Sequence, residues 1–265
     1  MHPVLIRLGP LTVHTYGFMM AVGVGFALWF VYVQAKKAGY DAAKLLDAAF
    51  YIIIVSLVGA KLILLIGNFS YYTKYPRELL SLARSGGVFQ GGLTFGVLFA
   101  VWYFRRRKIP LWPTADLVGP AVALGHGFGR LGCFNAGCCY GRTCDTALGV
   151  VFRSDYAHEL TGIPLGLKLH PVQLYESGLN FLNFLILFLV LRKKKFDGQV
   201  FSLYIINYSV IRFFTEYFRG DHDVNKYLLR GASAFTSLSL PQLFCLLGLA
   251  AGFGLFLMLK RRESD

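Results

Sequence analysis

Seven apolar segments of about 20 residues each recur along this 265-residue chain. A helix that crosses a bilayer needs about 20 mainly apolar residues, so each segment is long enough to span one. The composition agrees, because 55% of the residues are hydrophobic and only 15% are charged, against about 25% in soluble domains. We therefore expect an all-α integral membrane protein with seven transmembrane helices, at residues 16–34, 46–67, 87–104, 113–134, 173–191, 199–218 and 241–259. No internal repeat or linker divides the chain, so residues 1–265 are expected to form a single membrane domain.

The chain carries a formal net charge of +13, which in a soluble protein would favour a nucleic-acid partner. Here, however, 14 of the 27 basic residues fall in four clusters that share one side of the membrane if seven spans alternate. By the positive-inside rule that side is cytoplasmic, so we expect the N-terminus outside and the C-terminus inside. The positive charge then reflects topology, and we expect no nucleic-acid partner. Segments 140–169 and 219–240 then face the opposite side, where we expect a small exoplasmic cap. The basic clusters are Lys36, Lys37 and Lys44; Arg105 to Lys108; Arg192 to Lys195; and Lys260 to Arg262.

Ionisable residues interrupt several of these segments, although a charge at the bilayer centre costs at least about 2.5–3.5 kcal/mol. Counted at ~1.5 Å per residue from the cytoplasmic ends of their segments, Arg130 lies ~26 Å up, Lys61 ~22 Å and Arg212 ~21 Å. More cations than carboxylates at this level favours an anionic ligand, and the abundant one there is a phospholipid phosphate. Polar side chains from six segments reach the same outer half of the membrane: Tyr16, Lys61, Gln90, Arg130, Glu176 and Arg212.

Two structural explanations stay open for these residues. A long arginine near a helix end can reach the lipid headgroups by snorkelling. Arg212 and Glu216, one helical turn apart, can form an ordinary i,i+4 ion pair that neutralises itself. Asp116 lies on the cytoplasmic side of its segment, and there we expect a structural role.

Glycines spaced four residues apart recur in the third and fourth segments and just beyond them. Such spacing lets two helices approach closely, which is the general explanation for it in membranes. Exposed glycine amides near Arg130 would in addition be able to donate hydrogen bonds to phosphate oxygens. The pairs are Gly87 with Gly91, Gly92 with Gly96, Gly125 with Gly129, and Gly137 with Gly141.

Four of the five cysteines crowd into the short stretch from Cys133 to Cys144, spaced C-x4-C-C-x4-C. This spacing matches neither a C-x2-C zinc pair nor the ferredoxin patterns, so no metal is expected from it. An exoplasmic disulfide, for instance through Cys144, and simple packing of small residues both stay open. Cys245 lies in an apolar run and is expected to be a buried small hydrophobe.

Residues 125–141, GHGFGRLGCFNAGCCYG, resemble the signature of the prolipoprotein diacylglyceryl transferase family. Supporting blocks follow in the family's order, so the resemblance covers nearly the whole chain. They are LGPLTVHTYG near the N-terminus, SGGVFQGGLTFG in the third segment, HPVQLYES before the fifth, and INYSVIRFFTEYFRGDHD in the sixth.

The resemblance implies a multi-pass enzyme of the bacterial inner membrane with seven spans, its N-terminus outside and no cofactor. Its substrates would be phosphatidylglycerol and the lipobox cysteine of a prolipoprotein signal peptide. The cysteine thiol would take the diacylglyceryl group as a thioether, and glycerol phosphate would leave. By motif, Arg130 and Arg212 match the family's essential arginines and Tyr16 its N-terminal tyrosine. The other matched positions, expected in substrate binding together with Lys61, are Gly141, Tyr208, Glu216 and Arg219.

Gln90 is the main departure from the family pattern, because many members carry a histidine there that has been proposed as the base for the thiol. A neutral amide accepts no proton at pH 7, so Gln90 is expected to act only through hydrogen bonds. The family also commonly has Asn at the position of Cys133 and an acid or Gln at that of Cys138. The preferred mechanism therefore rests on Arg130 and Arg212 stabilising the leaving phosphate, with Tyr16 or water as acceptor of the thiol proton.

Two rival functions remain at this point. A phospholipid or anion transporter also places cations in a membrane cavity, but it usually shows repeats and polar groups through both halves. A non-catalytic lipid-binding paralogue is the second alternative, because Gln90 replaces the histidine proposed as the base. The sequence leaves four properties open: the identity of the base, the acyl-chain preference, the oligomeric state and the prolipoproteins that are substrates.

Overall fold

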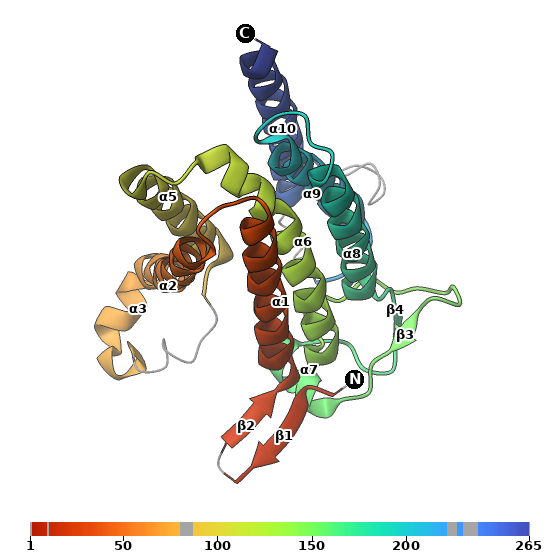
Figure 1. Cartoon of the computed structure of the whole chain (residues 1–265). Helices are drawn as coiled ribbons and strands as arrows, with labels where there is room; N and C mark the ends of the chain where they lie inside the picture. The colour runs from red at the N-terminus through yellow and green to blue at the C-terminus, as the bar shows by residue number, and fades with distance from the viewer. Residues whose placement is uncertain (1, 10, 80–86, 222–226, 230–237, 265) are drawn as a thin grey trace. The chain divides into compact units, whose positions relative to one another are not determined.

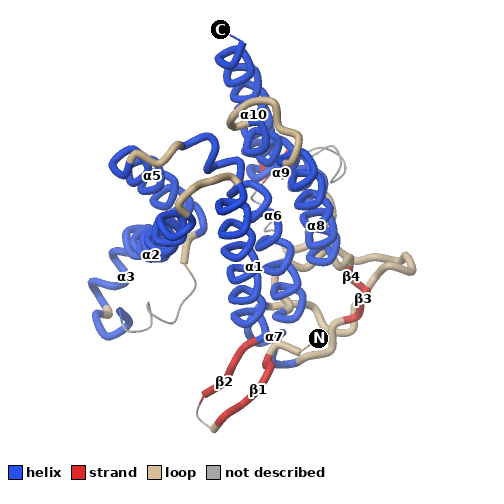
Figure 2. The backbone as a smooth tube through the Cα atoms, viewed as in Figure 1, coloured by secondary structure: helices blue, strands red, loops and turns tan. Residues whose placement is uncertain are grey.

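The computed structural model describes residues 2–9, 11–79, 87–221, 227–229 and 238–264. These residues are mostly helical (Figure 2). They form two compact units, one made of Met1–Phe30 with Ala115–Asp265 and the other of Val31–Thr114. We describe each unit by itself.

Each of the seven expected segments is a helix, with ends that shift by a few residues. The long helices are α1 (Thr15–Lys37), α2 (Ala42–Gly67), α5 (Phe89–Arg107), α6 (Leu111–Ala136), α8 (Val172–Leu191), α9 (Gln199–Glu216) and α10 (Leu240–Ser264). Short helices are α3 (Phe69–Lys74), η1 (Pro76–Glu78) and α7 (Asp155–Thr161). Three two-stranded antiparallel sheets complete the described chain: β1 (Val4–Leu8) with β2 (Leu11–His14), β3 (Val150–Val151) with β4 (Lys168–Leu169), and β5 (Tyr227–Leu229) with β6 (Leu238–Ser239).

Four of the long helices are both long and apolar enough to cross a membrane: α1, α2, α8, and α10 over Leu240–Glu263. The chain is therefore a helical membrane protein. Helices α5, α6 and α9 occupy the other expected spans but carry more glycine and polar side chains. Seven spans and their orientation stay predictions.

In the unit Val31–Thr114, α5 lies against α2 along its glycines. A Cβ built at Gly91 would lie 2.6 Å from Ile63 Cγ1 and 2.7 Å from the Gly59 carbonyl oxygen. A Cβ at Gly92 would lie 3.1 Å from the carbonyl oxygen of Ser56. Any larger residue would force the two backbones apart, which confirms the packing interpretation of these glycines.

In the other unit, α6 runs between α1 and α8 (Figure 1). On the α1 side, a Cβ at Gly23 would lie 2.9 Å from the carbonyl oxygen of Gly125, and the rings of Phe26 and Phe128 stack 5.3 Å apart. On the α8 side, Ser177 Oγ donates to the Gly127 carbonyl oxygen over 2.9 Å. Small residues thus bring α1 and α8 close to the helix that carries Arg130.

Residues 140–169 fold over the end of α6 around a small core of their own. Phe152, Ala157, Ile163 and Leu169 are buried there and pack against Phe134 at the end of α6. That this segment forms an exoplasmic cap stays a prediction. Of the second expected cap segment, 219–240, residues 222–226 and 230–237 lie outside the described residues.

Asp116 does the structural work expected of it, at the start of α9. Its side chain is fully buried and accepts from the backbone N–H groups of Gly198, Val200 and Phe201 at 2.8, 2.9 and 3.0 Å. Lys194 Nζ lies 3.0 Å from the same carboxylate and neutralises it. A carboxylate on α6 therefore holds the positive end of the α9 dipole.

We expect Asp116→Ala to lower the free energy of unfolding by about 2–4 kcal/mol, because it leaves several buried N–H groups and a lysine without their acceptor. Asp116→Asn keeps one acceptor oxygen and is expected to lose less. The measurement is thermal unfolding in detergent. Asp197→Ala is the matched control, since Asp197 is half-exposed and also binds Lys194, at 2.6 Å. Equal stability of Asp116→Ala and Asp197→Ala would contradict the capping role.

Candidate active site

The Glu176 carboxylate connects three helices at one level of the larger unit. It lies in the second turn of α8, with its side chain only 2% exposed, and forms ion pairs with Arg130 of α6 and Arg212 of α9. Arg212 Nη1 lies 3.4 Å from Glu176 Oε1, and Thr215 Oγ1 donates to the same oxygen over 3.0 Å. One buried acid therefore fixes both arginines that the sequence singles out.

Each arginine makes a second contact through the same nitrogen that faces Glu176. Arg130 Nε donates to His126 Nε2 over 3.2 Å, one turn earlier on α6. Arg212 Nη1 lies 2.6 Å from Glu216 Oε2, so the predicted i,i+4 pair is confirmed. The ring of Tyr208 lies 5.2 Å from that of His126. Residues from α6 and α9 thus restrict both arginines to narrow positions.

The charges of this cluster balance, which differs from the expected excess of cations at this level. Two guanidiniums, Arg130 and Arg212, face two carboxylates, Glu176 and Glu216. The arginine side chains are 13% and 15% exposed, and in the described chain these contacts use only Arg130 Nε and Arg212 Nη1. The remaining N–H groups have the forked geometry that grips a phosphate or carboxylate with two hydrogen bonds. The site is suited to an anion through fixed donors rather than through net charge.

Gly141 lies where the loop after α6 meets the end of α9. It pairs with Arg219 in an isolated β-bridge, and Gly220 N donates to the Tyr140 carbonyl oxygen over 3.0 Å. A Cβ at Gly141 would lie 2.7 Å from the Cβ of His170, so no larger residue fits without displacing the loop. Gly141 is therefore required for the close contact between this loop and His170, and its role in substrate binding stays a prediction.

Arg219, next to this bridge, holds Asp221 with two hydrogen bonds of 3.0 and 2.6 Å. Burial alone would lower the pKa of the Arg219 guanidinium, but Asp221 and the nearby Cys139 raise it above its ordinary value. Arg219 is thus charged at every physiological pH, and a carboxylate of its own already engages it.

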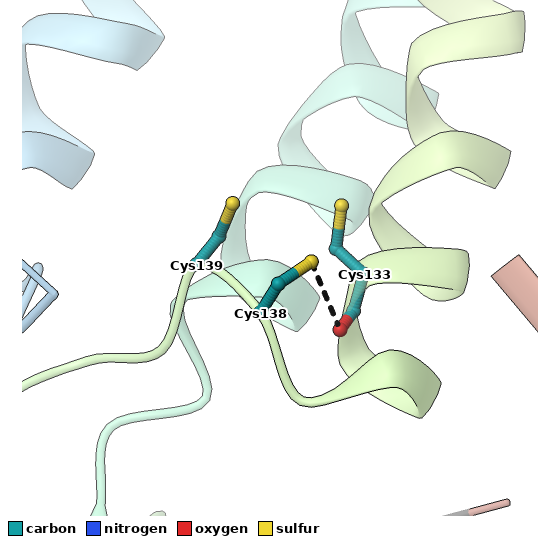
Figure 3. A group of neighbouring side chains, drawn as sticks. All are labelled: Cys133, Cys138 and Cys139. Carbon is teal, nitrogen blue, oxygen red and sulfur yellow. Dashed lines mark hydrogen bonds between the residues drawn. The ribbon is translucent and has the colours of Figure 1, made fainter. Parts of the chain in front are cut away.

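Tyr16 and three cysteine thiols lie beside Arg130. The Tyr16 backbone packs on α6, since a Cβ at Gly132 would lie 3.2 Å from its carbonyl oxygen. The Sγ atoms of Cys133, Cys138 and Cys139 all lie within 4.8 Å of one another (Figure 3). All five cysteines are free thiols, which decides against a disulfide in this structure, and Cys245 is buried as expected.

Lys61 and Gln90 belong to the other unit. Lys61 lies within α2 and Gln90 is the second residue of α5. Their participation in the site of Arg130 and Arg212 stays a prediction.

Sequence reasoning missed the bridging role of Glu176 and the contributions of His126 and Thr215. A signal was present, because HPVQLYE places an acid near the start of α8, at the level of Arg130 and Arg212. The pairing itself depends on how three helices rotate about their axes, which no single segment specifies.

A family profile described as prolipoprotein diacylglyceryl transferase matches residues 3–258. A phosphatidylglycerol–prolipoprotein diacylglyceryl transferase of Clostridium tetani is 37% identical over 239 residues, which are 90% of this chain and 93% of the relative. A protein of the same name from Methylibium petroleiphilum is 32% identical over 268 residues, covering 98% of this chain and 97% of the relative. Clostridium perfringens has a transferase of that name, numbered 2, that is 32% identical over 221 residues, 83% of this chain and 84% of its own.

Glu176→Gln tests the bridge directly. Without the negative charge two buried guanidiniums lose their common partner, and breaking such a pair costs about 3–5 kcal/mol. We expect a correspondingly lower thermal unfolding midpoint in detergent. Glu159→Gln, at an exposed position of α7, serves as the control and is expected to change little. Unchanged stability of the Glu176 variant would show that the bridge does not hold the helices.

Proposed function

The chain belongs to the prolipoprotein diacylglyceryl transferase family, and we propose that the cluster around Glu176 is the site at which it acts. The activity is the transfer of a diacylglyceryl group from phosphatidylglycerol to a prolipoprotein, the first step of lipoprotein maturation. The observation that supports the proposed site is the pairing of Arg130 and Arg212 on one buried carboxylate.

In this proposal, Arg130 and Arg212 hold the phosphate of phosphatidylglycerol. The lipobox thiol attacks the glyceryl carbon, a C–S bond forms, the C–O bond to phosphate breaks, and glycerol phosphate leaves with the electron pair. Negative charge grows on the departing phosphate in the transition state. Donors already fixed by Glu176 stabilise that charge without reorganising, which is the largest contribution in many enzymes.

The remaining predicted residues support this step. Tyr208 packs against His126 and so helps to position Arg130, while Glu216 positions Arg212 directly. Gly141 and Arg219 pair with each other and shape the loop beside the arginines. Tyr16 borders the site and is proposed to contact the thiol. Lys61 is proposed to bind the lipid.

Gln90 is proposed to donate a hydrogen bond rather than to take the thiol proton. A free thiol has a pKa of about 8.5, so a few per cent is thiolate at neutral pH, and nearby guanidiniums increase that share. The demand for a base is thus smaller than it would be for a hydroxyl nucleophile.

The membrane arrangement belongs to the same proposal. We place the protein in the bacterial inner membrane with seven spans, the N-terminus outside and the C-terminus cytoplasmic, within a single membrane domain. The cap segments 140–169 and 219–240 then face the exoplasmic side, where a translocated signal peptide presents its cysteine. The basic clusters at the ends of α1, α5 and α10 support this orientation.

Arg130→Lys and Arg212→Lys are each expected to lose most of the activity while keeping the charge, because an ammonium cannot grip two phosphate oxygens in a fixed geometry. The assay combines purified protein, phosphatidylglycerol and a lipobox peptide, and mass spectrometry detects the diacylglyceryl adduct. Arg153→Lys, at an exposed position, is the control, and Lys61→Met is expected to be milder. Near wild-type turnover of both folded arginine variants would rule out phosphate clamping.

Gln90→Ala is expected to slow transfer around tenfold, the scale of one polar hydrogen bond at ~1.4 kcal/mol. Gln90→His is expected to be tolerated. Transfer rate against pH is measured for the natural protein and both variants. A natural protein that is inactive and becomes active on Gln90→His would show that a base at this position is essential and that this chain is a non-catalytic paralogue.

The orientation is tested by a cysteine introduced after Arg262. We expect a membrane-impermeant thiol reagent to label it only after the inner face of the membrane has been opened. The parent protein without the added cysteine gives the background from its own five thiols. Labelling of the new cysteine in intact cells would reverse the topology.

A further inference from the structure

Three cysteine thiols converge directly after the helix that carries Arg130. Cys133 lies in the last turn of α6, and Cys138 and Cys139 lie in the turn that follows (Figure 3). This turn folds back because Gly137 and Cys139 adopt left-handed backbone conformations, with φ of 80° and 59°. Gln173 Nε2 anchors it by donating to the Cys138 carbonyl oxygen over 2.8 Å. The three side chains are half-buried, and their sulfur atoms lie close together on one side of the turn.

Three thiols at such a point are a ligand set for a soft metal ion. Zinc binds thiolate sulfur at about 2.3 Å, so the sulfurs of a tetrahedral site lie roughly 3.8 Å apart. The three Sγ atoms here already lie within 4.8 Å of one another, so closing on an ion requires movements of about an ångström. Three protein ligands with an open fourth position are typical of catalytic rather than structural zinc sites.

The surrounding charges suit such an ion. Three thiolates around a divalent cation carry a net charge of −1, and a fourth thiolate makes it −2. Arg130 precedes Cys133 by three residues on α6 and interacts electrostatically with Cys133 and Cys139, and Arg219 also interacts with Cys139. Each guanidinium is also paired with a carboxylate, Glu176 or Asp221, so the two offset part of the negative charge of the four-thiolate complex.

The carboxylate and the imidazole that contact Arg130 are both already engaged by guanidinium groups. Glu176 is engaged by both arginines, and His126 Nε2 accepts from Arg130. Gln90 is a neutral amide wherever it lies. A metal-bound thiol needs no such base, because coordination removes its proton outright.

We propose that Cys133, Cys138 and Cys139 bind one thiophilic divalent cation of the zinc class, whose open fourth position takes the cysteine thiolate of the prolipoprotein substrate. This inference rests on the proposed function. The incoming thiol displaces the water on the ion and releases its proton to solvent. The coordinated sulfur then attacks the glyceryl carbon as the C–O bond to phosphate breaks, and the electron pair leaves with glycerol phosphate. The thioether product is a weak ligand, so water replaces it.

The linear spacing C-x4-C-C argued against a metal because it matches no familiar pattern. The fold changes that argument, since the back-turn brings the sulfurs together. Only the fourth cysteine of the stretch, Cys144, lies apart from this group, where its Sγ lies 3.0 Å from Thr146 Oγ1.

The first test measures metal binding without activity. The full-length protein in detergent is stripped with a chelator and reloaded with Zn²⁺ or Co²⁺. We expect one ion per chain by elemental analysis and sulfur-to-cobalt charge-transfer absorption. Each single Cys→Ser change at 133, 138 or 139 is expected to weaken binding at least tenfold, and the triple change to abolish it. Cys144→Ser and Cys245→Ser are matched controls that keep binding. Circular dichroism verifies that every variant is folded.

The second test adds a lipobox peptide to the cobalt-loaded protein. We expect the charge-transfer absorption to increase as a fourth thiolate coordinates, and no change with a peptide in which serine replaces the cysteine. Diacylglyceryl transfer is expected to fall at least tenfold on chelation and to return with Zn²⁺.

The outcomes separate the two proposals. Transfer that survives chelation and the triple change at full rate, or an ion that binds equally to the triple variant, would overturn the metal site. Metal binding with no spectral response to the cysteine peptide would overturn its role with substrate. A spectral response to the peptide without transfer under any condition would support the thiol site and refute the proposed function.

Discussion

The carboxylate of Glu176 is the interaction on which the rest of this site depends. Two guanidiniums at the end of a buried helix bundle would repel each other and would each require several kcal/mol of desolvation. A shared acid between them removes the repulsion and sets both at fixed positions. Glu216, which pairs with Arg212, is the second carboxylate that makes the cluster neutral before a ligand arrives. Its affinity for a phosphate must come from unused, well-directed N–H groups, and such donors act most strongly when charge develops during the reaction.

A second buried carboxylate gives α9 its position along α6. Asp116 binds the first N–H groups of α9, and Glu176 binds Arg212 near its last turn. Both contacts are charged and buried, so a shift of α9 by one residue would break one of them at high cost. The distance from Asp116 to Arg212 is therefore fixed by the α9 helix itself. Glycines on α6 complete the arrangement by letting α1 and α8 approach closely.

The sequence predicted the helices well because a period of about 20 apolar residues is imposed by the bilayer and needs no tertiary information. It also identified Arg130, Arg212, Glu216 and Asp116, since a charge among apolar residues stands out. It did not predict that Glu176 joins the arginines, that the N-terminus forms a hairpin, or that three thiols converge. Each of these depends on contacts between segments, or on a turn whose left-handed residues include Cys139 as well as Gly137. The spacing of the cysteines along the chain does not predict that turn.

The position of the thiols relative to Arg130 has a consequence for the reaction itself. A displacement at carbon requires the nucleophile and the leaving group on opposite sides of the reacting carbon. In a productive complex the attacking sulfur lies about 3–3.5 Å from that carbon. Arg130 and Cys133 are three residues apart on one helix, an axial separation of about 4.5 Å. In the two proposals, a single helix end thus carries both the arginine that holds the leaving phosphate and a cysteine that holds the ion with the attacking sulfur. Neither depends on a mobile loop for its spacing.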